Sequence, residues 1–167
     1  MLFGRVNREA SLLRDAVFAS SDGVVTTFAV VAGSLGANLG SNVVLILGFA
    51  NLLADGVSMA SGIYLGAKSE ADFEKKRKNQ HWRQDIPPLQ GLVTLLSFIV
   101  SGFVPLAPYV FKMDNPATVS ILFMVAFLLI VGTVRRRPLE TVLVGGTAAM
   151  VAYLVGYGMD KYFIGGR

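Results

Sequence analysis

Cysteine is absent from the 167 residues of this chain, and histidine and tryptophan occur once each. Without cysteine there is neither a disulfide framework nor a thiolate metal site. The single histidine, His81, has no second histidine with which to share a metal ion, so we interpret it as a solvated loop residue. Charge is also scarce, at 16% of residues, whereas 53% are hydrophobic and the mean hydropathy is +0.58. This balance excludes an ordinary water-soluble domain and favours a protein that lies in a lipid bilayer.

Long apolar stretches dominate the sequence. Five of them are long enough to cross a hydrocarbon core, which takes about 20 helical residues; they cover residues 16–39, 42–67, 89–111, 116–134 and 141–159. We therefore expect an all-α integral membrane protein of five transmembrane helices, in one domain over residues 1–167. The charged segment 68–88 is expected to be a cytoplasmic loop that begins as an extension of the second helix. The first fifteen residues hold no apolar run of signal-peptide length, so we expect no cleavable leader.

Lysine and arginine predict how the chain is oriented. Twelve of the 15 lie in the N-terminal segment, in the segment 68–88 and at 135–137, whereas only Lys112, Lys161 and Arg167 fall on the other side. The positive-inside rule then places the N-terminus in the cytoplasm and the C-terminus outside. Because the positive charge is divided among short juxtamembrane segments, it favours contact with anionic lipid and not with nucleic acid. We expect a multi-pass protein of the plasma (inner) membrane.

Two charged residues, Asp22 and Asp55, lie inside the five spans. An ionised aspartate in hydrocarbon costs several kcal/mol, and no lysine or arginine lies within the spans as its partner. A short turn with Gly40 and Ser41 at its tip joins the first two spans, which predicts an antiparallel hairpin with both aspartates at one depth. Two carboxylates at one level disfavour each other's ionisation unless a cation lies between them. A divalent ion and protons are therefore natural alternative occupants.

Helical spacing adds further candidate residues. Four-residue and seven-residue intervals define two polar stripes, one of Asn51, Asp55 and Met59 and the other of Asp15, Asp22 and Thr26. Carboxylate and amide oxygens suit hard divalent cations, and a thioether moves the preference toward later transition metals. Ferrous iron or manganese fits this mixture best, as a transported substrate and not as a cofactor. Met59 taken alone is also explained by simple packing.

Other interpretations of the two aspartates stay open. Protonated, they could serve only as hydrogen-bond donors between helices, as in a membrane assembly protein that transports nothing. An intramembrane aspartyl protease could use such a pair to activate water. However, Asp22 follows Ser21 and Asp55 follows Ala54, so the G-x-G-D pattern of those enzymes is absent. We therefore expect a transporter and not an enzyme.

Two segments resemble a known family. RDAVFASSDGVVTTFAVVAGSLGA and GFANLLADGVSMASGIYLGAKSE are similar to the first two helices of the vacuolar iron transporter family. The resemblance implies a five-helix homodimer that exports ferrous iron or manganese from the cytosol in exchange for protons. It also implies that Asp22 and Met59 bind metal in the pore, and that Asp15 lies near its cytoplasmic mouth.

The chain departs from this family in two places. Asn51 stands where the best-known members carry a glutamate, and Asp55 supplies an acid one turn away, which we interpret as a relocated carboxylate. Those members also insert a helical domain rich in glutamate and methionine between the second and third helices, whereas the segment 68–88 has four acids and no methionine. The sequence thus predicts a short form without a metal-gathering domain. We place three residues on the path of metal and protons, namely Asp15, Thr26 and Glu70.

Overall fold

The computed structural model describes residues 2–76 and 86–164, and the side chains of residues 9–73 and 86–163. Helices account for nearly all of these ranges, and no strand occurs within them: α1 (Leu2–Gly36), α2 (Ser41–Lys76), α3 (Pro87–Val110), α4 (Pro116–Val134), α5 (Pro138–Met159) and the short π-helix η1 (Asp160–Ile164). In the part of the chain described, five helices are long and apolar enough to cross a membrane. The predicted class of fold is confirmed.

The first two helices are longer than the spans expected from hydropathy. At 35 and 36 residues, α1 and α2 extend about 52 to 54 Å, well beyond a hydrocarbon core of about 30 Å. The N-terminal part of α1 and the C-terminal part of α2 therefore project beyond the apolar region. Lysine, glutamate and arginine are good helix formers, which explains why both helices continue through these polar segments.

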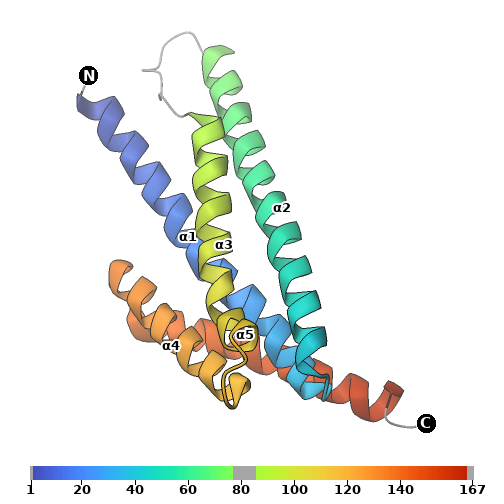
Figure 1. The fold of residues 1–167 in the computed structure, drawn as a ribbon. Helices are drawn as coiled ribbons and strands as arrows, with labels where there is room; N and C mark the ends of the chain where they lie inside the picture. Colours follow the sequence, from blue (N-terminus) through green and yellow to red (C-terminus); the bar gives the residue numbers. More distant parts are fainter. Residues whose placement is uncertain (1, 77–85, 165–167) are drawn as a thin grey trace.

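The third helix lies between the first two. In Figure 1, α1 and α2 meet at the turn formed by residues 37–40 and diverge toward their other ends, with α3 in the space between them. We expected α1 and α2 to face each other directly as a hairpin; instead both pack more extensively on α3 than on one another. The two glycines that follow the aspartates explain this difference. A Cβ on Gly23 would fall 2.5 Å from the Phe98 carbonyl oxygen, and one on Gly56 would fall 3.4 Å from the Phe98 ring.

The core lies where α3 crosses α1 and α2. Val24, Leu52 and Phe98, one from each helix, are almost fully buried there. Many large apolar side chains on the outer surfaces of the helices are exposed, among them Ile46 and Leu143. An apolar outer surface of this kind is expected for helices that are surrounded by the hydrocarbon of a lipid bilayer.

The fifth helix packs on the first through small residues. A Cβ on Gly156 would collide with the backbone of Gly33, and one on Gly33 would lie 3.4 Å from the Ala152 carbonyl oxygen. The stripe of small residues along α5 thus lets two backbones approach closely within one chain. Figure 1 shows α4 beside the first part of α5, which then continues across the molecule toward the C-terminus, far from the N-terminus.

Candidate functional site

Asp22 and Asp55 lie at equal distances from the turn that joins their helices. Asp22 precedes the end of α1 at Gly36 by 14 residues, and Asp55 follows the start of α2 at Ser41 by 14 residues. Each is therefore about 21 Å along its helix from the turn. Both are half-buried.

The repeated Asp-Gly pair fixes the directions of the two aspartates. Gly23 and Gly56 approach Phe98 of α3 from two sides. In each helix the aspartate precedes the glycine by one residue, so its side chain points about 100° away from the glycine around the helix axis. Because α1 and α2 run in opposite directions, these rotations turn Asp22 and Asp55 toward the same face of α3. The short repeat thus has a structural basis, since each glycine admits α3 and each aspartate flanks it.

Three further candidate residues lie on the same two helices as the aspartates, and two of them, Thr26 and Met59, make other contacts. Asn51 and Met59, one turn to either side of Asp55, are half-buried, and Met59 packs against the apolar core. The Thr26 hydroxyl donates a hydrogen bond of 2.8 Å to the backbone carbonyl of Asp22. Within the described residues, no group of three or more histidine, cysteine or acidic side chains is placed to hold a metal ion. A single chain therefore offers two carboxylates, one amide and one thioether.

Asp15 is held between α1 and α3. Its side chain is only 3% exposed and pairs with the neighbouring Arg14 guanidinium at 2.9 Å. From α3, the Gln90 side-chain amide donates a hydrogen bond of 3.2 Å to the other carboxylate oxygen. The Gln90 amide oxygen is buried and, among the described residues, has no hydrogen-bond partner. Asp15 is thus a fixed and partly neutralised acid.

A pocket of about 120 Å³ opens beside Gln90, between α1, α2 and α3. It is lined by Ser11 and Arg14 of α1, by Gln90 of α3, and by five residues of α2, namely Gly62, Ile63, Gly66, Ala67 and, in the charged extension of that helix, Glu70. A Cβ on Gly62 or Gly66 would meet nothing within 4 Å. These glycines therefore line a pocket. Glu70 and the ion pair of Arg14 with Asp15 lie at the same end of the molecule.

Sequence reasoning missed Gln90 and Arg14. Gln90 is the one side-chain amide in α3, just after Pro87 and Pro88, and an isolated amide at the start of an apolar span is the signal that could have found it. The interpretation of His81 as a solvated residue falls on a position outside the described residues. The cytoplasmic location of the loop that contains His81 also stays a prediction.

Fold and site together define a multi-pass helical membrane protein with acidic side chains on adjacent spans. The chain belongs to the VIT family, which it matches over residues 13–88 and 79–157. The resemblance of the first two helices is therefore confirmed, and the match extends to residue 157, in α5.

Several relatives are named as iron transporters. A vacuolar iron transporter of Toxoplasma gondii is 41% identical over 49% of this chain and 28% of its own length. Vacuolar iron transporter 2 of rice is 32% identical over 87% of this chain and 59% of its own length. A vacuolar iron transporter of Centaurea cyanus is 28% identical over 84% of this chain and 85% of its own length.

The chain spans less than two thirds of the first two of these relatives. Its alignment with the Centaurea cyanus protein runs over 208 positions, more than its own 167 residues, so that relative carries residues without a counterpart here. All three are named as transporters, which agrees with the expectation that the chain is not an enzyme. They are also named for the vacuole, so the expected plasma (inner) membrane location is not supported.

Proposed function

We propose that this protein transports ferrous iron or manganese out of the cytosol in exchange for protons, and that Asp22 and Asp55 form its central metal site. The observation that carries the proposal is the placement of two half-buried carboxyl groups at equal distance from the α1–α2 turn in a VIT-family fold. Asn51 and Met59 flank Asp55 and contribute an amide oxygen and a thioether sulfur. This donor set suits first-row divalent metals.

Proton exchange follows from the charge of the site. Two carboxylates in an apolar region repel each other unless a cation neutralises them. Neither lysine nor arginine lies between residues 15 and 67 to provide that charge. Metal therefore neutralises the pair in one state and protons in the other, because ligand carboxylates must lose their protons to bind metal.

The active form is a homodimer. A manganese ion favours six ligands in octahedral geometry, more than the two carboxylates, the amide and the thioether of one chain. A second copy would add its own Asp22 and Asp55 and would cover part of the exposed apolar surface of α2, which includes Leu53 and Val57. The N-terminus of each chain faces the cytosol, in keeping with the distribution of lysine and arginine.

Flux in proteoliposomes tests the proposal. Purified protein is reconstituted, divalent iron or manganese is added on one side, and a pH-sensitive dye reports proton movement. Asp22→Asn and Asp55→Asn keep the shape of each side chain but remove its charge, so each should fold normally and lose most of its flux. Asp72→Asn removes an exposed acid from the polar extension of α2 and serves as the matched control. Undiminished flux in both site variants would disprove the metal site, and flux without opposing proton movement would disprove the exchange.

A further inference from the structure

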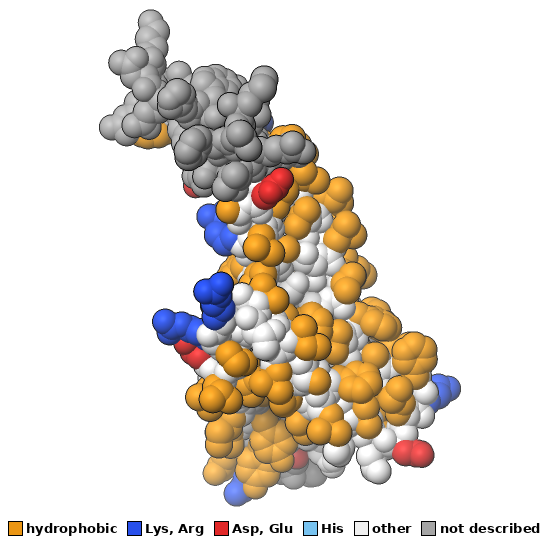
Figure 2. All heavy atoms as spheres, turned by 90° about the vertical axis from the view of Figure 1, so that its left-hand side faces the viewer, with side chains coloured by type: hydrophobic (Ala, Val, Ile, Leu, Met, Phe, Trp, Pro, Cys, Tyr) orange, Lys and Arg blue, Asp and Glu red, His pale blue; other side chains and the backbone are white. Residues whose placement is uncertain are grey.

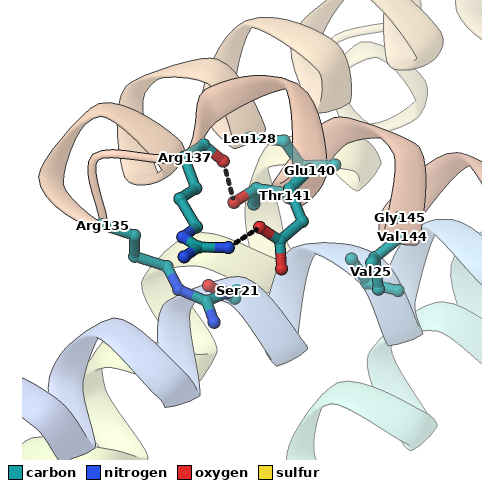
Figure 3. Close-up of a pocket in the computed structure, with 9 residues that line it drawn as sticks. All are labelled: Ser21, Val25, Leu128, Arg135, Arg137, Glu140, Thr141, Val144 and Gly145. Carbon is teal, nitrogen blue, oxygen red and sulfur yellow. Dashed lines mark hydrogen bonds and ion pairs between the residues drawn. The ribbon is translucent and has the colours of Figure 1, made fainter.

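A second pocket lies between α1, α4 and α5. It has a volume of about 150 Å³ and combines basic, acidic and apolar side chains: Ser21, Val25, Leu128, Arg135, Arg137, Glu140, Thr141, Val144 and Gly145. Figure 3 shows its polar end, where side chains of the α4–α5 connection and the first turn of α5 lie over Ser21 of α1. None of these residues belongs to the proposed metal site.

One of the two arginines in the pocket has no acidic partner among the described residues. Arg137 donates a hydrogen bond of 2.9 Å to the Glu140 carboxylate, and this bond raises the pKa of Arg137 above its usual value. Arg135, in contrast, forms no ion pair with a carboxylate of the described residues. In Figure 3 its guanidinium group extends toward Ser21, into the pocket. The Arg135 charge is thus available to an anion.

An apolar groove of about 440 Å³ continues from the pocket along α1. The two share Ser21 and Arg135, and the groove adds Ala10, Leu13, Arg14, Val17, Phe18 and Val134. Leu13, Phe18 and Val134 are each more than half exposed. Figure 2, which views the molecule from the side of the α4–α5 connection, shows basic side chains gathered beside apolar surface. A cationic pocket joined to an apolar groove matches a ligand with an anionic head and a hydrocarbon tail.

We propose that this pocket and groove bind one anionic phospholipid, with its phosphate at Arg135 and Arg137 and an acyl chain along Leu13, Val17 and Phe18. Arginine is well suited to phosphate because its planar guanidinium group offers several donors in one plane. The location agrees, since Arg135 follows directly after the apolar span that ends at Val134. Basic pockets between transmembrane helices are known to hold acidic head groups.

The turn after α4 separates the arginines. Arg136 has a φ of 58°, and the Arg137 backbone N–H donates to the Gly132 carbonyl at 2.9 Å, which closes the helix end. Arg135 and Arg137 line the pocket, whereas Arg136 lines neither the pocket nor the groove. Arg136 therefore provides a control with the same charge in the same connection.

Lipid titration of the full chain in detergent, followed by native mass spectrometry, tests this site. Phosphatidylglycerol should bind saturably with one tight site per chain, and phosphatidylcholine should bind more weakly. Arg135→Gln should weaken phosphatidylglycerol binding about fivefold, the effect of one basic residue at an anionic surface. Arg136→Gln should bind like the parent chain. Unchanged thermal unfolding of both variants would establish that they fold.

Four results would overturn the proposal. Equal losses in Arg135→Gln and Arg136→Gln would mean that only the overall charge attracts lipid. Equal affinity for phosphatidylcholine would reduce the site to an apolar groove, and competition by inorganic phosphate as strong as that by lipid would make it a site for free anions. Efficient disulfide formation between two Val17→Cys chains would show that a second copy fills the groove. None of these experiments measures metal flux, so their results test the lipid site independently of the transport proposal.

Discussion

Gln90 of α3 donates a hydrogen bond of 3.2 Å to the buried carboxylate of Asp15 in α1, across 75 residues of sequence. Both groups are buried, so water cannot readily replace a lost partner. The bond joins α1 to the start of α3, beside the pocket that contains Glu70.

Gln90→Leu should therefore destabilise the protein by about 1 to 3 kcal/mol, because a carboxylate oxygen of Asp15 would be left without its donor. Unfolding in detergent by heat or denaturant measures the change. The double variant Asp15→Leu with Gln90→Leu should lose less stability than the sum of the two single variants. Strict additivity would contradict a direct interaction between the two side chains.

Gly23→Ala should be disruptive although alanine is the better helix former. Its Cβ would fall 2.5 Å from both the Phe98 carbonyl oxygen and the Ser101 hydroxyl oxygen, so α3 would have to move away from α1. We expect a loss of about 1 to 3 kcal/mol, as in other overpacked cores. Gly146→Ala is the matched control, because a Cβ there would meet nothing within 4 Å. Equal stability of the two variants would show that α3 does not pack this closely.

Asn51→Ala and Met59→Ala should change selectivity more than they change rate. Each substitution removes one uncharged metal-ligand atom, the amide oxygen or the thioether sulfur, and leaves both carboxylates in place. We expect the ratio of iron, manganese and cobalt uptake to shift, with the loss of the thioether disfavouring the later metals. Ser58→Ala, at an exposed position of α2, should leave the ratio unchanged. If Met59→Ala had the ratio of the parent chain, Met59 would be a packing residue only.

Glu70→Gln should weaken metal capture without stopping transport. Glu70 lines the pocket at the polar end of α2, so its charge would attract cations before they reach Asp22 and Asp55. The KM for metal should rise severalfold at low ionic strength while the maximal rate is kept, and added salt should reduce the difference. Asp72→Asn controls for a general loss of acidic charge. Complete loss of flux in Glu70→Gln would instead place Glu70 in the central site.

The absence of cysteine allows a clean test of orientation. Lys112→Cys and Arg136→Cys place single thiols in the α3–α4 and α4–α5 connections, at positions whose φ values of 49° and 58° are similar. A membrane-impermeant maleimide applied from outside should label only Lys112→Cys, and permeabilised membranes should label both. The reverse pattern would invert the predicted topology.

Hydropathy predicted the five helices because length and apolarity alone define a span, and counting from the turn related Asp22 to Asp55. Neither hydropathy nor counting could predict that α3 lies between α1 and α2. Periodicity indicates which residues share a helical face, but not which other helix that face meets, and Phe98 resembles many apolar residues of α3. For the same reason the hydrogen bond between Asp15 and Gln90 was not predicted, since the local sequence around either residue does not indicate which distant residue it will contact. The close approach of Gly156 in α5 to Gly33 in α1 likewise became evident only from the fold.

Phe98 places its backbone against Gly23 and its ring against Gly56. In the proposed metal site, one aromatic residue would therefore set the spacing between two acidic side chains contributed by different helices. Coordination chemistry depends on the separation of ligand oxygens as well as on their identity. Natural variation could thus adapt such a protein to an ion of another radius through a residue that binds no metal, while every ligand stays the same.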